Sequence, residues 1–176
     1  MNFRLNKIYT GLAISPSFVN AVQIRKNKTQ WELLNWAHHA FEEERLSYSF
    51  REKRVPDFQK LAMAISEVMQ SMEKKRLTIG LALPNEVIKV SLKHFENLPE
   101  TGTKINEMVT WEMEKALQLP HASARIDYFQ PDKSKDTLKP NLLTAIGVDD
   151  VLSEYEVLCS QMELEPALIA PTAICQ

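Results

Sequence analysis

The feature that most constrains the fold of this chain is a hydrophobic pattern that changes its period several times along 176 residues. Segments rich in β-branched and aromatic residues alternate with segments in which apolar residues recur every three or four positions. The first pattern is typical of strands and the second of amphipathic helices. A chain that switches repeatedly between them is expected to fold as an α/β protein.

The first part of the chain predicts a three-strand meander followed by a helix. The stretches SPS and RKNKTQ, which separate the strands, are turn sequences. Asp57 is the candidate N-cap of the helix, and Lys74, Lys75 and Arg76 form its cationic end. The predicted bounds are residues 8–14, 18–24 and 31–40 for the strands and 58–72 for the helix.

The next segments continue this alternation. LTIGLALP lacks polar alternation and predicts a strand buried on both faces. EVIKVSLKHF alternates, with Ile88, Val90 and Leu92 on a predicted apolar face and Lys89, Ser91 and Lys93 on a predicted solvent face. The rest predicts a helix at 103–118, strands at 124–130 and 142–148, a loop at 131–141, a helix at 150–163 and a short strand in EPALIAP. The predicted order is therefore βββα, β, then βαββα, then β.

Composition narrows the possible classes of function. Lys and Arg number 21 against 23 Asp and Glu, so the net charge of −2 gives no general attraction for nucleic acid. Cys159 and Cys175 lie in apolar stretches without metal-like spacing, which favours buried thiols in a reducing compartment. Neither a signal peptide nor a run of about eighteen apolar residues is found. We therefore expect a cytoplasmic protein that does not insert into the membrane.

Patterns for metals and catalysis are weak. None of the four histidines, His38, His39, His94 and His121, forms a pair with the i, i+4 spacing of helical metal ligands. Asp127, Asp149 and Asp150 form the one acidic group to consider, but Asp149 and Asp150 are interpreted as helix-capping residues. The prediction is no catalytic residue and no metal site.

Three stretches resemble successive segments of the PilM family of type IV pilus assembly proteins, which have an actin-like fold related to that of FtsA. They are GLALPNEVIKVSLKHFENLP, WEMEKALQLP with ARIDYFQPD, and LLTAIGVDDVLSEYEVLCSQMELEPALIAP. The resemblance implies a ribonuclease-H-like subdomain interrupted by an inserted βαββα subdomain. It places residues 1–84 plus 165–176 in the first, which would be incomplete, and residues 85–164 in the second.

The same resemblance locates a phosphate loop at GLAISPS, and that loop is degenerate. Ala13 and Ser15 stand where the family has an Asp and a Gly, and Pro16 removes an N–H donor beside Ser17. We interpret Ala13, Ser15, Pro16 and Ser17 as a turn between strands, with a phosphate site as the less favoured alternative. The second actin-like domain, which would close over the adenine, is expected to be absent, so that the chain is a fragment. No cofactor is predicted for it, and ATP would bind only to a complete protein.

One helix carries two residues on unexpected sides. On a helical wheel, Glu112 falls within the apolar face of the helix at 103–118, and Trp111 falls outside it, on the polar side with Lys104, Glu107 and Glu114. A carboxylate near a core needs a partner, and an exposed indole is a common interface anchor. The alternative is that Glu112 reaches solvent and Trp111 covers its own chain.

The resemblance implies a non-enzymatic scaffold that binds the N-terminal cytoplasmic tail of a PilN-like bitopic inner-membrane protein in a groove between the subdomains. It also implies a link to pilus motor ATPases and a location at the inner membrane through that partner. The predicted contact residues are Lys89, Lys93, Trp111 and Glu112. Apolar surface near residues 169–174 is expected to favour a homo-dimer or burial by a partner. The alternatives are an actin-like ATPase and the cytoplasmic domain of a GspL-like type II secretion protein.

Overall fold

The computed structural model describes residues 7–28, 30–41, 46–72, 77–95, 98–99, 102–120, 123–130 and 141–174. The order of its strands and helices is the predicted one, so this prediction is confirmed. The elements are β1 (Lys7–Ile14), β2 (Phe18–Asn27), β3 (Gln30–Ala40), α1 (Phe58–Met69), β4 (Leu77–Leu83), β5 (Lys89–His94), α2 (Gly102–Ala116), β6 (Ala124–Phe129), β7 (Asn141–Val148), α3 (Asp149–Gln161), β8 (Leu164–Pro171) and a final 3-10 turn, η1 (Thr172–Ile174).

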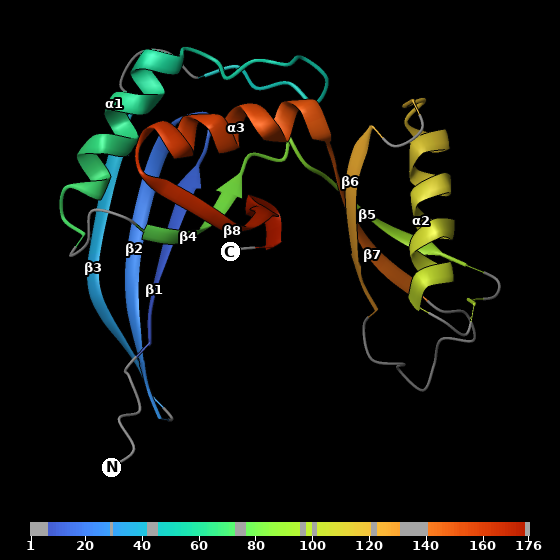
Figure 1. Ribbon diagram of the computed structural model, residues 1–176, viewed down its shortest axis with the longest axis horizontal. Helices are drawn as coiled ribbons and strands as arrows, with labels where there is room; N and C mark the ends of the chain where they lie inside the picture. The colour runs from blue at the N-terminus through green and yellow to red at the C-terminus, as the bar shows by residue number, and fades with distance from the viewer. Residues whose placement is uncertain are drawn as a thin grey trace.

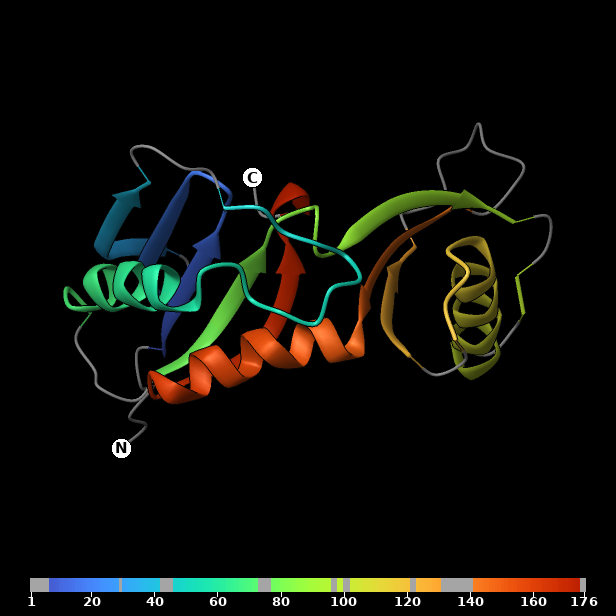
Figure 2. The ribbon, with the colours of Figure 1, turned by 90° about the horizontal axis from the view of Figure 1, so that it is seen from above.

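A first lobe is built on a five-stranded sheet with the order β3-β2-β1-β4-β8. The strands β1, β2 and β3 form the antiparallel meander, whereas β4 pairs in parallel with both β1 and β8. Both α1 and α3 lie on the same face of this sheet (Figures 1 and 2). Leu12, Val19 and Ile79 from the sheet are buried there together with Leu61 and Leu158 from the helices.

A second lobe is a three-stranded antiparallel sheet with the order β5-β7-β6, covered on one face by α2 (Figure 1). Its separate hydrophobic cluster is centred on Val109 and Met113 from α2 and on Leu142 and Ile146 from β7. Each lobe therefore packs around its own core, and the two lie side by side along the long axis of the molecule (Figure 2).

Helix α3 packs with the first lobe, although it directly continues β7 of the second. The buried side chains Val151, Tyr155, Leu158 and Cys159 belong to the cluster of the five-stranded sheet. The predicted division placed α3 in the inserted subdomain of residues 85–164, whereas these side chains of α3 pack in the core of the first lobe. An apolar helix face shows that a helix is buried but does not show which sheet covers it. The proposed division into subdomains itself remains a prediction.

Ile88 is buried as predicted, but within β5 itself the predicted faces are reversed. The Ser91 side chain points toward α2, where its hydroxyl lies 2.9 Å from Thr144 Oγ1 and 3.9 Å from Met113 Sδ. Leu92, predicted to face a core, is 52% exposed. The residues of β5 alternate between two faces as predicted, but α2 covers the face of Lys89, Ser91 and Lys93, because these residues pair with Ile146, Thr144 and Leu142 of β7, which are buried beneath α2.

The predicted helix caps have mixed outcomes. Asp57 is the N-cap of α1, and its carboxylate accepts the backbone N–H of Lys60 at 3.2 Å. The N-cap of α3 is Val148, which makes no side-chain cap, so the interpretation of Asp149 and Asp150 as capping residues is wrong. Strand β7 runs directly into α3, and both aspartates already lie in the first helical turn. The predicted features at residues 74–76, 131–140, His121 and Cys175 lie outside the described residues.

Within the described part of the chain, no helix is long and apolar enough to cross a bilayer.

Candidate functional site

The main candidate site is a cavity of about 270 Å³ between the two lobes. Its walls come from β6 and β7 of the second lobe and from α3 and β8 of the first lobe. Most of its lining is apolar, and the charged side chains are concentrated at β6 and α3. The lining residues are Ile88, Arg125, Ile126, Asp127, Ala145, Gly147, Leu152, Glu156, Pro166, Ala167, Leu168, Ile169 and Pro171.

Small residues on β7 create this space. Ala145 and Gly147 both line the cavity. They point away from the face on which Thr144 and Ile146 are buried, since neighbouring residues of a strand alternate between faces. A Cβ at Gly147 would lie 2.8 Å from Leu152 Cδ1, so α3 approaches β7 closely at this point. Helix α3 therefore packs closely against β7 at Gly147, whereas the neighbouring part of β7 leaves space for the cavity.

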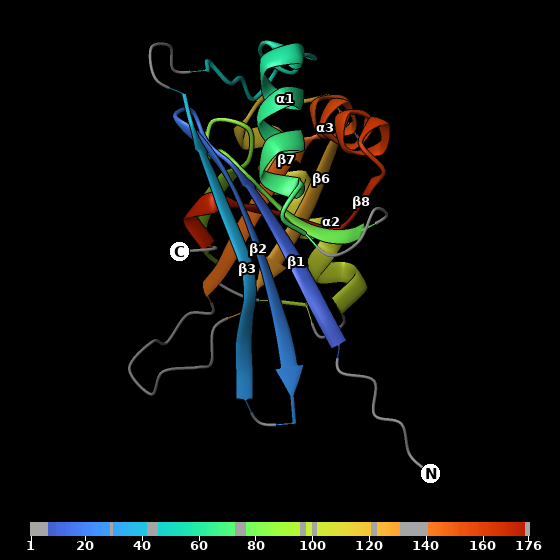
Figure 3. The ribbon, with the colours of Figure 1, turned by 90° about the vertical axis from the view of Figure 1, so that its left-hand side faces the viewer.

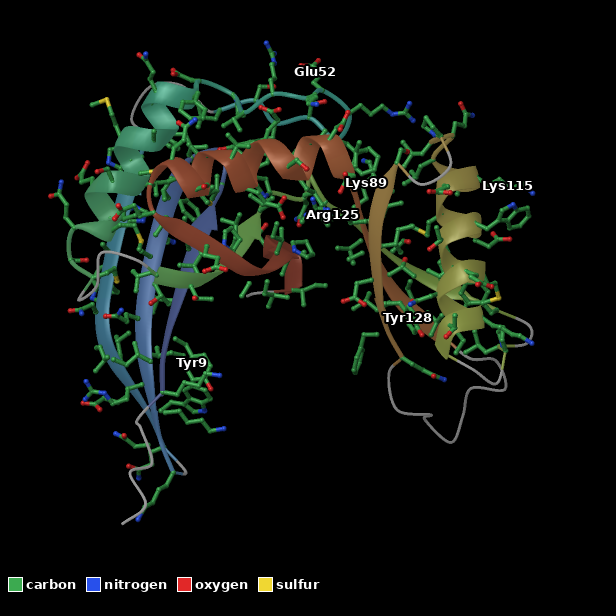
Figure 4. The ribbon with its side chains drawn as sticks, in the orientation of Figure 1. Tyr9, Glu52, Lys89, Lys115, Arg125 and Tyr128 are labelled. Carbon is green, nitrogen blue, oxygen red and sulfur yellow. The ribbon has the colours of Figure 1, made fainter. Side chains whose placement is uncertain are left out.

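Arg125 lines the cavity and connects the two lobes (Figure 4 labels it). It extends from β6 to α3, where its guanidinium Nη2 donates to Glu156 Oε2 at 3.0 Å and to Ser153 Oγ at 3.2 Å. Its Nε donates to the Asp149 carboxylate. The hydrogen bonds that Arg125 donates to Glu156 and, with a smaller effect, to Asp149 raise the pKa of Arg125 above its ordinary value. The forked arrangement holds β6 at a defined distance from α3.

The lining of the cavity carries more carboxylates than cations. Asp127 and Glu156 contribute carboxylates, and Arg125 is the cation of the lining. Glu156 already pairs with Arg125, whereas the Asp127 carboxylate accepts its neighbour's backbone N–H, that of Tyr128, at 2.8 Å. A ligand group that meets Asp127 is therefore favoured if it is a cation or a hydrogen-bond donor.

Strand β8 offers backbone groups next to this cavity. It ends the five-stranded sheet and, among the described strands, pairs only with β4. The pairing shifts register between Ile79 and Gly80, and Leu168 beside this irregularity is 63% exposed. An edge strand with an exposed apolar side chain is a surface on which an extended peptide can add as a further strand.

The segment at residues 46–55, between β3 and α1, forms a strap that runs over the first lobe and reaches its junction with the second (Figures 1 and 2). Leu46, Tyr48 and Val55 are buried in the core of the first lobe, whereas Phe50 is buried in the core of the second. Arg51 Nη2 also donates to the Leu117 carbonyl at 2.6 Å. Sequence reasoning assigned no role to this strap, and its alternating tyrosine and phenylalanine were the available signal.

The predicted degenerate phosphate loop forms a turn whose polar groups bond to one another. The Ser15 N–H donates to the Phe18 carbonyl at 2.9 Å, and Ser15 Oγ accepts the N–H groups of Ser17 and Phe18 at 3.3 and 3.1 Å. The Pro16 carbonyl accepts the N–H of Leu46 at 2.9 Å. The turn thus directs two of its N–H groups at its own serine. Ala13 precedes it on β1, half-buried.

The predicted contact residues do not gather at the cavity, since Lys89, Lys93, Trp111 and Glu112 are all absent from its lining. The ammonium of Lys89 lies 5.2 Å from the ring centroid of Phe50, and Lys93 pairs with Leu142 across the sheet. Trp111 is 57% exposed on α2, as expected, and the Lys115 ammonium lies 4.5 Å from its ring (Figure 4 labels Lys115).

The buried carboxylate of α2 was missed. Glu112 is half-buried, whereas Glu114, which the helical wheel assigned to the polar side, is 5% exposed. Glu114 is covered even though it lies outside the apolar stripe of α2, so the helical wheel alone could not reveal its burial.

The remaining candidates make ordinary surface contacts. His39 Nδ1 lies 2.8 Å from Glu67 Oε2, and His38 Nδ1 lies 2.5 Å from Asn20 Oδ1. Among the described residues no group of three His, Cys, Asp or Glu side chains is arranged to hold a metal ion. The absence of a metal site stays a prediction for the whole chain.

Comparison with known proteins gives structural matches. No family model matches the sequence, and no curated protein matches it. The fold resembles a solved PilM-PilN type IV pilus biogenesis complex with a TM-score of 0.73 and 17% identity, over 94% of this chain and 47% of that chain. It also resembles the cytoplasmic domain of EpsL, an inner membrane component of the Vibrio cholerae type II secretion system. That match has a TM-score of 0.56 and 7% identity, and it covers 94% of this chain and 57% of the EpsL chain.

The chain spans about half the length of these solved structures. At such low sequence identities the likeness concerns the fold alone. The mixed α/β architecture expected from the sequence is confirmed, and its arrangement is similar to those of both neighbours. The chain therefore has a PilM-like fold.

Proposed function

We propose that this chain is a non-enzymatic scaffold of type IV pilus assembly that binds the N-terminal cytoplasmic tail of a PilN-like inner-membrane protein. The observation that carries the proposal is the apolar cavity between the lobes, beside the edge strand β8, in a chain with a PilM-like fold. The proposed location is cytoplasmic and peripheral to the inner membrane through that partner.

The cavity favours a particular kind of tail. Exposed Leu168 and the neighbouring Ile169 would accept apolar side chains, and the edge of β8 would pair with an extended backbone. Asp127, which forms no ion pair with Arg125, favours a tail that also carries a lysine or arginine. Cytoplasmic segments beside membrane spans are enriched in these two residues. The steering role first assigned to Lys89 and Lys93 would therefore pass to the Asp127 carboxylate of the cavity.

A titration tests this proposal. The probe is a synthetic peptide of the N-terminal cytoplasmic tail of the PilN-like protein encoded beside this chain, added to the amide-labelled chain. We expect shifts centred on Ala145, Leu168 and Ile169, and modest affinity because ordering a flexible tail offsets part of the contact energy. Saturating peptide without shifts, or shifts on α1, would refute the groove.

A pair of variants sharpens the test. Leu168 and Met63 are both exposed, at 63% and 74%, but only Leu168 lines the cavity. Leu168→Asp should weaken binding by at least tenfold, because it places a carboxylate against the apolar part of the tail. Met63→Asp on α1 should bind as the unmodified chain does. Equal losses in both variants would show that the peptide does not use the cavity.

Nucleotide binding belongs to the same proposal. The Ser15 turn bonds its N–H groups internally, which supports a chain that neither hydrolyses nor appreciably binds ATP. Isothermal titration with Mg-ATP should give no binding isotherm. A clear one-to-one isotherm in the micromolar range would favour the actin-like ATPase instead.

A second candidate function is the cytoplasmic domain of a type II secretion protein of the GspL kind, which the likeness to EpsL favours. Pull-down with the tail of the neighbouring pilus protein separates the two candidates, since a GspL-like domain should not retain it. A link to motor ATPases and a homo-dimer formed through residues 169–174 remain part of the proposed scaffold role.

A further inference from the structure

The five-stranded sheet presents large apolar side chains on the face opposite α1 and α3. Strand pairing aligns Val22 with Trp36 and Ile24 with both Tyr9 and Leu33, so these side chains share one face. Trp31 is 57% exposed, Leu33 is 59% exposed and Trp36 is 69% exposed. We name the exposed side chains of Tyr9, Val22, Trp31, Leu33 and Trp36 the aromatic face. Contiguous apolar surface of this kind marks an interaction site.

Lysines border the aromatic face at the end where Trp31 lies. Lys7, Lys26 and Trp31 form one row across β1, β2 and β3. The Lys7 ammonium lies 5.0 Å from the ring centroid of Tyr9, and that of Lys26 lies 5.1 Å from the ring centroid of Trp31. The rings of Tyr9 and Trp31 are 5.5 Å apart, and Lys28 follows in the turn after β2. Aromatic rings and ammonium groups are therefore interleaved on one surface.

The described strands β1, β2 and β3 place no carboxylate on this face, and the exposed Glu165, which pairs with Thr78, lies on the same face at the β8 edge of the sheet. Among the described residues of β1, β2 and β3, Glu32 is the one carboxylate. It pairs with Arg25 at 3.5 Å, and strand alternation places both on the face opposite Lys26 and Trp31. If a second copy of the chain packed the same part of its sheet against this face, its lysines would meet these lysines, and it would supply no carboxylate to pair with them.

We propose that the aromatic face and Lys7, Lys26 and Lys28 dock this chain on a bilayer that contains anionic lipid. Tryptophan and tyrosine favour the membrane–water interface, where the ring is buried and its polar edge stays hydrated. Each lysine can place its ammonium at the phosphate level while its stem covers apolar surface. The combination matches an anionic interface better than it matches a purely apolar partner.

The shape of the first lobe allows this contact. The ends of β2 and β3 extend away from α1 and α3, as seen from the side of the meander (Figure 3). Tyr9 lies on β1 near the same end, well below the helices (Figure 4). This end of the meander is therefore well separated from α1 and α3. The aromatic face adjoins the proposed peptide site, because its Val22 lines a cavity of about 230 Å³ together with Leu168, whereas Trp31, Trp36 and Lys26 line neither this cavity nor the one between the lobes.

The experiment measures binding of the whole chain to vesicles. The chain carrying Trp111→Phe, whose fluorescence comes from Trp31 and Trp36, is mixed with phosphatidylcholine vesicles with or without phosphatidylglycerol. We expect flotation with the anionic vesicles, a blue shift of emission, and quenching by brominated acyl chains. Lys26→Gln should lower the partition coefficient about fivefold, as should Lys28→Gln, and high salt should lower it further.

Two double variants distinguish docking through the aromatic face from unspecific binding of any exposed tryptophan to vesicles. Trp31→Ser with Trp36→Ser should abolish flotation while leaving the circular dichroism melt unchanged, because both side chains are exposed. Trp111→Phe with Lys115→Gln changes the similar pair on α2 and should leave flotation intact.

Three results would overturn the inference. They are equal binding to vesicles with and without phosphatidylglycerol, flotation that survives loss of Trp31 and Trp36, and self-association through the aromatic face without flotation. The last would assign the face to a second copy of the chain.

Discussion

At the residue scale, Gly147 is the position where a single methyl group should disturb the contact between β7 and α3. The added Cβ would lie 2.8 Å from Leu152 Cδ1 and 3.1 Å from Leu152 Cγ, so the buried Leu152 side chain must move. Gly147→Ala should lower the free energy of unfolding by about 1–3 kcal/mol, measured by urea titration.

Gly80 provides the matched control, because a Cβ there meets no atom within 4 Å. Gly80→Ala should change the free energy of unfolding by no more than about 0.5 kcal/mol. Similar losses in both variants would mean that crowding at Leu152 is not the cause.

Two buried tyrosines allow a second test at this scale. Tyr48 donates its hydroxyl to the Ser15 carbonyl at 3.3 Å, whereas the buried Tyr155 hydroxyl has no hydrogen-bond partner among the described residues. Tyr155→Phe should leave stability unchanged or raise it, and Tyr48→Phe should cost about 1 kcal/mol. Thermal and urea unfolding of both variants would measure the difference. A greater loss for Tyr155→Phe would reveal a partner for its hydroxyl.

At the scale of elements, the strap of residues 46–55 is the segment that joins the two cores. Phe50 is 7% exposed within the second lobe, while residues on either side of it are buried in the first. Phe50→Ala should lower the free energy of unfolding by about 3 kcal/mol. Hydrogen exchange should show that the amides of β5 and β7 lose protection more than those of β1.

Phe58 supplies the control for this prediction. It lies at the start of α1 and is 37% exposed, so Phe58→Ala should cost about 1 kcal/mol. If Phe50→Ala lowers protection evenly in both lobes, the strap does not stabilise the second lobe selectively.

At the scale of the whole molecule, the first lobe should lose stability in alkali. Burial raises the pKa of Cys159 to about 12, with a smaller contribution from the Glu156 charge. Burial also raises the pKa values of Tyr48 and Tyr155 above their ordinary range. The unfolded chain releases these protons near their ordinary pKa values of about 8.5 and 10, while the folded chain retains them.

The sign follows from the number of protons bound in each state. Above about pH 8.5 the unfolded state binds fewer protons, so stability is complete below this pH and falls as the pH rises. The slope should approach about 1.4 kcal/mol per pH unit for each group that titrates. Urea midpoints across the alkaline range measure it. The variant with Cys159→Ala and Tyr155→Phe should show a shallower slope, and a flat profile for the unmodified chain would contradict the prediction.

Local pattern was sufficient for much of the architecture. The order of all the strands and helices followed from hydrophobic period and turn residues, because both act over a few neighbouring positions. Asp57 as a cap and Trp111 as an exposed side chain are similarly local properties. The turn at Ser15 also depends on adjacent residues, and its hydroxyl bonds within the turn as a short polar side chain can.

The candidate site required the tertiary structure. Arg125 and Glu156 are 31 positions apart, and no periodicity within β6 or α3 indicates that they pair. Leu92 and Glu114 were assigned to the wrong surroundings because a strand or helix pattern identifies faces without naming what covers them. The sequence by itself determined which segments become strands and helices and which of their faces are apolar. Only the packing of α3 onto the first lobe and of the strap across both decided where the cavity lies, since those contacts join residues distant along the chain.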